Sequence, residues 1–294
     1  MMKTPAAEKQ SKMLAYACIL GAAFFWGIIG IWNRRLMDSG VSPTSIVVIR
    51  NIGSMLLLSA IFAVKDRSMF RVKKEHLKYF FGTGVISVVL FTLCYFSCQK
   101  VCSLAMASIF LYTAPSFVVI MAAILWKEPV TKKKLAALVL TLVGCALVCG
   151  IFAGELTVTT AGILFGLGAG FFYALYSIFS RYALKHYSAI KCTLWMFIFA
   201  GAASVFLIRP DELSVLLNFE EGLTALILVV FSTGTPFLLY TTGLSRVEAG
   251  KASIIASFEP VIAALAGVLV FGEPMSVSMI AGILCILGGV CILR

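Results

Sequence analysis

Ten separate runs of about 20 mostly apolar residues cover most of this 294-residue chain. A helix needs about 20 such residues to cross the hydrocarbon core of a bilayer, which is about 30 Å thick. Lipid offers the backbone no hydrogen-bond partner, so these runs must fold as helices that satisfy their own N–H and C=O groups. We therefore predict an all-α integral membrane protein with ten transmembrane helices. The runs occupy residues 14–33, 44–63, 77–99, 103–126, 134–152, 160–183, 189–207, 222–243, 250–271 and 277–293.

The composition excludes a soluble protein. Apolar residues make up 61% of the chain and charged residues 13%, whereas soluble domains have about 45–50% and about 25%. A formal charge of +11 would suggest nucleic acid as the partner of a soluble protein. In a membrane protein the positive residues instead indicate which loops are cytoplasmic. We therefore expect the chain to lie in a lipid bilayer and not to bind nucleic acid.

Lys and Arg residues are distributed unevenly between alternate loops. If the N-terminus is cytoplasmic, 19 of the 24 Lys and Arg residues lie on the cytoplasmic side, and only Arg34, Arg35, Lys100 and Arg209 lie outside. This bias predicts that both termini are cytoplasmic. The cytoplasmic set is Lys3, Lys9, Lys12, Lys65, Arg67, Arg71, Lys73, Lys74, Lys78, Lys127, Lys132, Lys133, Lys134, Arg181, Lys185, Lys191, Arg246, Lys251 and Arg294.

The sequence contains an internal duplication. Residues 20–34 (LGAAFFWGIIGIWNR) match residues 167–181 (LGAGFFYALYSIFSR) at seven of fifteen positions. Residues 107–131 align with 252–276 at an Ala-Ser-Ile head, at a central proline and at a Glu-Pro pair. The two offsets, 147 and 145 residues, differ by only two, as expected after duplication and a change in one loop length.

The duplication predicts two domains, residues 1–153 and 154–294. Each unit holds five predicted helices, and an odd number of crossings forces the second copy to lie upside down in the membrane. Inverted repeats of this kind place a substrate site near the midplane between the copies. We therefore expect the site at the interface of the two units.

The repeated pattern resembles the EamA branch of the drug/metabolite transporter superfamily. The shared features are a Gly-rich aromatic first helix, an arginine in the second helix, an Ala-Ser head, a proline in the middle of the fourth and ninth helices, and a Lys-Glu-Pro or Gly-Glu-Pro end. The resemblance covers essentially the whole chain. It implies a monomer or homodimer that moves small organic metabolites across a bacterial inner membrane, often as an exporter. Members of that superfamily carry amino acids, amines and nucleosides on one scaffold, so the resemblance leaves the solute open.

Two ionisable residues, Arg50 and Glu259, lie within predicted spans. A charged side chain at a helix centre costs about 2.5–3.5 kcal/mol on insertion scales, so such residues mark functional sites. Glu259 precedes Pro260, which can bend a helix where the freed carbonyl faces a cavity. Three roles fit the carboxylate: counter-ion of a substrate ammonium, proton coupling, or ion pairing with Arg50. Arg50 also fits a structural role in which its stem snorkels toward the surface.

Aromatic residues at mid-span form a second group of candidates. Interfacial belts hold aromatic residues at the headgroups, which these positions avoid. An adaptable aromatic pocket would suit flat solutes, or an amine through cation–π contacts, although simple helix packing is the competing interpretation. The substrate-binding candidates are Trp26, Tyr95, Tyr112, Tyr173, Tyr176 and Tyr240, with Ser177, Ser180 and Thr241 as weaker ones. The predicted helix kinks are Pro115, Pro236 and Pro260.

The Glu-Pro pairs that begin at Glu128 and Glu273 end the fourth and ninth predicted helices on opposite membrane faces. A role in helix capping or in a gate loop suits them better than substrate contact. Cys94, Cys98 and Cys102 recur every fourth residue, which admits a soft-metal site, but small-residue packing suits them better. We expect no metal, no cofactor and no disulfide.

These features favour a secondary transporter that moves a small organic metabolite by alternating access. The expected solute is an amino acid, an aromatic metabolite or an amine, with proton coupling as one option and export as the expected direction. One alternative is an uptake carrier for a cationic amine such as a choline-like compound. A membrane-embedded lipid-modifying enzyme is a weaker alternative, because it would need paired acids or a nucleophile with its base. The chain has no GxxxxGK[ST] phosphate-binding loop, which argues against hydrolysis of ATP.

Overall fold

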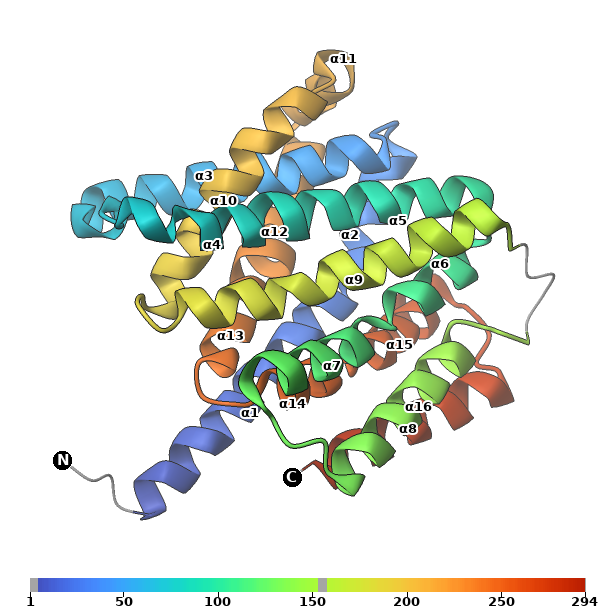
Figure 1. Ribbon diagram of the computed structural model, residues 1–294. Coiled ribbons are helices and arrows are strands. Elements are labelled where there is room, and N and C mark those ends of the chain that lie inside the picture. The colour runs from blue at the N-terminus through green and yellow to red at the C-terminus, as the bar shows by residue number, and fades with distance from the viewer. Residues whose placement is uncertain (1–4, 153–157, 294) are drawn as a thin grey trace.

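The computed structural model describes residues 5–152 and 158–293, and that part of the chain folds into helices joined by short loops (Figure 1). No strand occurs among these residues. The all-helical membrane fold expected from the sequence is therefore confirmed. The predicted domain boundary after residue 153, and the two terminal charges at Lys3 and Arg294, lie outside the described residues.

The two halves of the chain have corresponding elements. In the first half these are α1 (Pro5–Gly27), α2 (Ile29–Asp38), α3 (Pro43–Lys65), α4 (Leu77–Phe81), a π-helical segment (Gly82–Val89), α5 (Leu90–Val101), α6 (Leu104–Leu111), α7 (Ala114–Trp126) and α8 (Lys132–Val148). In the second half they are α9 (Thr160–Ala183), α10 (Ala189–Ser204), α11 (Pro210–Leu213), α12 (Phe219–Val229), a second π-helical segment (Val230–Gly234), α13 (Thr235–Leu244), α14 (Ala249–Ala256), α15 (Glu259–Phe271) and α16 (Val277–Ile292). Short 3₁₀ turns occupy Arg67–Phe70, Lys74–His76, Val205–Leu207 and Ser214–Leu217.

Eight helical segments of the described chain are long and apolar enough to cross a membrane. The fifth and tenth predicted spans correspond to α8, with 17 residues, and α16, with 16. At 1.5 Å per residue these two helices are about 24–26 Å long, a little less than the hydrocarbon core. The count of ten spans and the cytoplasmic placement of both termini stay predictions.

Several of the long segments are interrupted near their middle. The fourth and ninth break between α6 and α7 and between α14 and α15, and Pro115 and Pro260 lie in the first turn after each break. A proline is tolerated there because the first N–H groups of a helix have no partner within it. The third and eighth segments contain the π-helical turns, and Pro236 begins the helix after the second of these. The predicted kink residues thus lie at interruptions of the helices.

The cysteine stripe packs against glycines of α9. Cys98 Sγ lies 3.3 Å from the carbonyl oxygen of Gly162, and a Cβ built on Gly168 would lie 3.5 Å from Cys94 Sγ. All nine cysteines are free. The stripe therefore brings α5 close to α9, which run side by side in Figure 1.

The last helices of the two halves, α8 and α16, cross at glycines (Figure 1). A Cβ built on Gly144 would lie 2.7 Å from the carbonyl oxygen of Gly282, and one on Gly282 would lie 2.7 Å from that of Gly144. Small residues allow such close backbone approach in membranes, where packing rather than the hydrophobic effect joins helices.

We expect Gly144→Ala to destabilise the protein, because the new methyl group must push α8 away from α16. Overpacking of this kind typically costs about 1–3 kcal/mol. Gly288→Ala on α16 is the matched control, since no atom lies within 4 Å of a Cβ there. Thermal unfolding in detergent should show a lower melting temperature for Gly144→Ala alone. Equal melting temperatures for the two variants would contradict the glycine crossing.

Candidate functional site

A cavity of about 490 Å³ lies between the two halves. Its deep part is lined by Arg50, Tyr112, Tyr173 and Glu259, which come from α3, α9 and the two interrupted segments. Its mouth is lined by residues near helix ends: Asn33 (α2), Gln99 (α5), Leu104 (α6) and Glu273, which follows α15. The cavity therefore runs from the middle of the bundle to one end of it.

Arg50 and Glu259 line the same cavity but do not form a direct ion pair. Within the described residues, no salt bridge within 4.0 Å joins them; Arg50 Nε instead donates to Thr233 Oγ1 at 3.1 Å. Thr233 lies in the second π-helical segment and donates to the carbonyl oxygen of Leu228 at 2.9 Å. Arg50 is thus held by the opposite repeat, while the Glu259 carboxylate lies beside Tyr112 at the start of α15.

Gly27 brings α1 against the start of α15. A Cβ built on Gly27 would lie 2.8 Å from the backbone oxygen of Glu259, so the contact requires glycine. Because the break before α15 faces a cavity, its freed backbone groups need no lipid-facing partner. This packing fixes where the Glu259 side chain enters the cavity.

Four predicted aromatic candidates, Trp26, Tyr95, Tyr112 and Tyr173, line the cavity. Tyr95 OH lies 3.2 Å from Ser108 Oγ, and the ring of Tyr173 lies 5.2 Å from that of Phe91. The charged pair is therefore surrounded by aromatic surface. This arrangement suits a small solute with an apolar or aromatic part and polar ends.

The other two, Tyr176 and Tyr240, lie beneath the cavity in a closed cluster. Tyr176 OH and Thr241 Oγ1 are 2.6 Å apart, and Tyr240 OH lies 2.7 Å from Ser177 Oγ. Both tyrosines are buried and pack against Phe237 or Trp26. Of the weaker candidates, Thr241 and Ser177 belong to this cluster, and Ser180 is buried one turn further along α9.

A small space of about 30 Å³, lined mostly by buried side chains, continues below the cavity. It shares Tyr112, Tyr173 and Glu259 with the cavity and adds Ser253 and Ser257 of the ninth segment. Ligand pockets usually measure about 300–1,000 Å³, so a metabolite cannot pass through this space as it stands. The bundle is open at the mouth and closed at the other end.

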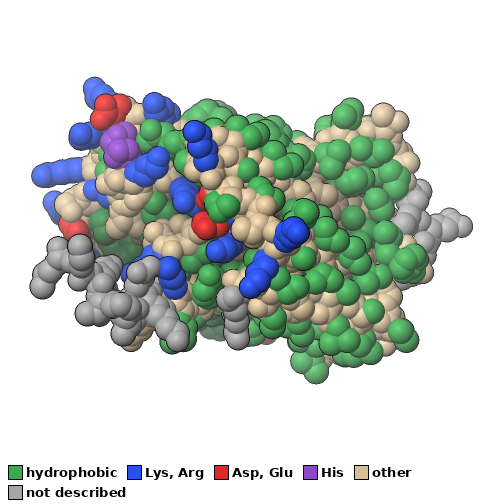
Figure 2. All heavy atoms as spheres, turned by 60° about the horizontal axis from the view of Figure 1, so that its bottom comes forward, with side chains coloured by type: hydrophobic (Ala, Val, Ile, Leu, Met, Phe, Trp, Pro, Cys, Tyr) green, Lys and Arg blue, Asp and Glu red, His purple; other side chains and the backbone are tan. Residues whose placement is uncertain are grey.

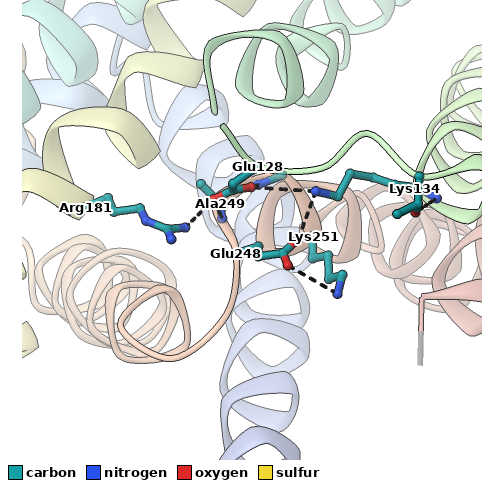
Figure 3. A network of polar contacts seen from close by, with 8 residues as sticks. Glu128, Lys134, Arg181, Glu248, Ala249 and Lys251 are labelled. Carbon is teal, nitrogen blue, oxygen red and sulfur yellow. Dashed lines mark hydrogen bonds and ion pairs between the residues drawn. The ribbon is translucent and has the colours of Figure 1, made fainter. Parts of the chain in front are cut away.

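A network of charges around the buried Glu128 and Lys134 lies at that other end (Figure 3). Glu128, which follows α7, accepts a hydrogen bond from Arg181 at 2.6 Å and lies 3.7 Å from Lys134 Nζ. Its two carboxylate oxygens also accept the backbone N–H groups of Ala249 (3.2 Å) and Gly250 (3.4 Å). One carboxylate therefore joins α8 and α9 to the first turn of α14, where the partial positive charge of a helix N-terminus favours an anion.

Glu248 completes the charge balance of this network. Lys134 is almost fully buried and lies 2.9 Å from the Glu248 carboxylate, with Lys251 3.7 Å away on the other oxygen. Partial burial works to raise the pKa of the Glu248 carboxyl, but Lys134 and Lys251 outweigh it and hold the pKa below its usual value. Glu248 is therefore charged at neutral pH, and the buried Lys134 lies between two acids, Glu128 and Glu248.

Sequence reasoning identified Glu128 as a capping or gate-loop residue but missed its partners. In the sequence Arg181 and Lys134 count only among the cytoplasmic charges and nothing singles out Glu248, because nothing local marks the three residues as a cluster. The repeat is the signal that points to the network. Each unit has an arginine at the end of its repeated first segment and a Glu-Pro pair after its fourth helix. Their contact runs between repeats, which alignment alone does not show.

Two segments of the chain, residues 13–150 and 160–294, each match the EamA-like transporter family. The chain belongs to this family. The resemblance expected from the sequence is confirmed, and this EamA protein is a multi-pass membrane transporter of the inner membrane.

Relatives of this EamA transporter carry uncharacterized-transporter names. One from Archaeoglobus fulgidus is 35% identical over 188 residues, which covers 64% of this chain and 66% of the relative, just under two thirds. The uncharacterized transporter YwfM of Bacillus subtilis is 26% identical and covers 94% of this chain and 92% of its own. The uncharacterized inner membrane transporter YicL of Salmonella typhimurium is 24% identical, over 94% of this chain and 93% of its own. A solved crystal structure shares the fold, with a TM-score of 0.80 at 19% identity over 95% of both chains.

We expect Glu259→Gln to leave the transporter folded and to reduce transport by about tenfold or more, since a hydrogen bond to a charged group contributes about 1.5–3 kcal/mol. The measurement is flux of radiolabelled amino acids and amines into proteoliposomes. Glu220→Gln, which removes a surface carboxylate paired with Arg35, is the control and should transport normally. Undiminished flux in Glu259→Gln would remove this residue from the site.

Proposed function

We propose that this protein is a secondary transporter that carries a small organic metabolite by alternating access between its two repeats. The observation that carries the proposal is the cavity of about 490 Å³, which is open at one end and ends on Arg50 and Glu259. The Glu128 network closes the opposite end. A pathway that is open on one side only is what alternating access requires of each of its states.

The lining of the cavity favours an amino acid with an apolar or aromatic side chain. Arg50 offers a guanidinium to a carboxylate, Glu259 offers a carboxylate to an ammonium group, and the aromatic walls receive the side chain. A zwitterion neutralises both charges of the cavity, whereas a solute of one charge leaves the other unpaired in a low dielectric.

The second candidate is a cationic amine. Glu259 together with Trp26, Tyr95, Tyr112 and Tyr173 would bind an ammonium group by ion pairing and cation–π contacts. Arg50 counts against this candidate, since it places a positive charge on the wall of the same cavity. Glu259 faces the ammonium group in both cases, and its protonation offers a route to proton coupling.

We propose that the cavity opens to the outside and that transport runs outward. The orientation is supported by the distribution of charge: Lys and Arg side chains gather around the histidines at one end of the molecule, whereas much of the remaining surface in that view is hydrophobic (Figure 2). The positive-inside rule assigns that end to the cytoplasm. Export is the direction that the resemblance to EamA exporters favours.

We expect aromatic amino acids to stabilise the purified protein more than the matching amines or acids do. Phenylalanine, phenethylamine and 3-phenylpropionate share the ring and differ in the charged ends, so they separate the roles of Arg50 and Glu259. Thermal shift followed by proteoliposome flux measures binding and transport in turn. Stabilisation by the amine alone would replace the zwitterion with the cationic-amine candidate.

We expect a cysteine at Ser68 to be labelled only from the cytoplasmic side, and a cysteine at Ser214 only from outside. Both positions are exposed and lie in short 3₁₀ turns outside the long helical segments. Membrane-impermeant maleimide applied to intact cells and to inverted vesicles makes the comparison. Labelling of Ser68→Cys only from outside and of Ser214→Cys only from the cytoplasm would overturn the proposed orientation. Labelling of both cysteines from the same side would overturn the topology.

A further inference from the structure

One arrangement of three side chains occurs twice in the structure. In the first, the Arg181 guanidinium lies 4.9 Å from the ring centroid of Trp126 and donates to Glu128 at 2.6 Å. In the second, Arg34 lies 4.4 Å from the ring of Phe271 and 3.7 Å from Glu273. The repeat offsets of 145 and 147 residues relate each member of one set to a member of the other. In both sets the arginine comes from one repeat and the aromatic residue and glutamate from the other.

The backbone before each glutamate is also the same. Lys127 ends α7 with φ of 53°, and Gly272 ends α15 with φ of 66°. The next N–H then returns to its helix: Glu128 donates to Ala122 at 3.3 Å, and Glu273 to Gly267 at 3.2 Å. Each glutamate side chain therefore leaves its helix end from an equivalent position, even though Lys127 must adopt a left-handed conformation to achieve it.

The two sets differ in what surrounds the glutamate. Glu128 is buried and binds the N–H groups of Ala249 and Gly250. The Glu273 side chain is about half exposed, at 51%, and one of its oxygens lies beside Gly267 at the mouth of the cavity. The glutamate of the first set is therefore enclosed by protein, and the glutamate of the second set faces the open mouth.

The sets lie at opposite ends of the ninth helical segment. Glu128 binds the start of α14, and Glu273 follows the end of α15, after a segment of 23 residues. At 1.5 Å per residue this separation is about 34 Å. The groups that correspond to Ala249 and Gly250 are Leu104 and Ala105 at the start of α6, and Leu104 lines the mouth together with Glu273. The hydroxyl of Ser103, the cap residue of α6, accepts the N–H of Met106 at 3.3 Å.

We propose that Glu273 and Arg34 are the residues that close the mouth, and that Glu273 then binds the N–H groups of Leu104 and Ala105 as Glu128 binds those of Ala249 and Gly250. This proposal rests on alternating access as proposed above. Both glutamates join the same two interrupted segments: Glu128 links the end of α7 to the start of α14, and Glu273 would link the end of α15 to the start of α6. A change of angle at the two breaks therefore opens one end as it closes the other.

The repeat also explains why the mouth is the end that stands open. The positions equivalent to Lys134 and Glu248 are Met279 and Ser103, so the mouth lacks the second ion pair of the buried network. A buried carboxylate with fewer partners is compensated less completely for its desolvation. The closed mouth is therefore the less stable of the two seals until a substrate occupies the cavity.

Hydrogen exchange of the backbone amides tests the proposal in full-length protein in lipid nanodiscs. Glu128→Gln should weaken the buried seal, speed exchange at residues 249–250 and slow exchange at residues 104–105, because loss of one charged hydrogen bond shifts the equilibrium between open and closed mouth toward the closed form by about tenfold. Adding Glu273→Gln or Arg34→Gln to that variant should abolish the slowing. Adding Glu220→Gln, which removes another outer-end carboxylate, should leave it unchanged.

Two outcomes would overturn the proposal, and they separate it from the proposed function. If exchange at residues 104–105 slows equally in Glu128→Gln and in Glu128→Gln combined with Glu273→Gln, another group closes the mouth. Alternating access would still stand in that case. If Glu128→Gln speeds exchange at residues 249–250 and leaves residues 104–105 unchanged, the two ends are not coupled, and alternating access fails with the gate.

Discussion

The absence of hydrogen-bond partners in lipid constrains every other feature of this protein. It forces the chain into helices and permits an interruption only where the freed backbone groups face protein or a cavity. The breaks before α7 and α15 satisfy this condition, because Tyr112 and Glu259 beside them line the internal cavity. The same constraint that builds the bundle therefore determines where a polar site can exist within it.

Duplication gives each half of the chain partners in the other half. Contacts that matter run between the repeats: Arg50 is held by Thr233, and Arg181 binds Glu128. Each half supplies groups that the other half needs, so neither repeat forms the cavity or its closed end alone. Two copies of one unit can then hold equivalent contacts in different states, closed at Glu128 and open at Glu273.

Buried charge in this bundle is tolerated through compensation. Glu128 and Glu248 face Lys134 and Arg181, and backbone N–H groups of α14 supply further donors. Removal of one member would leave the others desolvated and unpaired, so the network behaves as a unit. Arg50 and Glu259 are different, because they remain apart on the wall of a cavity that a solute can enter. Charges that satisfy one another join the helices, and the charges left apart are those to which the proposed function assigns the substrate.

The sequence by itself determined the helical membrane fold, the duplication, the family, and the two unusual charges at Arg50 and Glu259. These follow from hydropathy, spacing and internal alignment, which are local or periodic properties of the chain. Only the tertiary structure decided that Trp26, Tyr95, Tyr112 and Tyr173 line the cavity while Tyr176 and Tyr240 lie beneath it. It also decided which partners Glu128 finds, because the rotation of each helix depends on packing against segments 53 to 122 residues away. Side chains of one type at similar depths look alike in sequence, and packing alone distinguishes them.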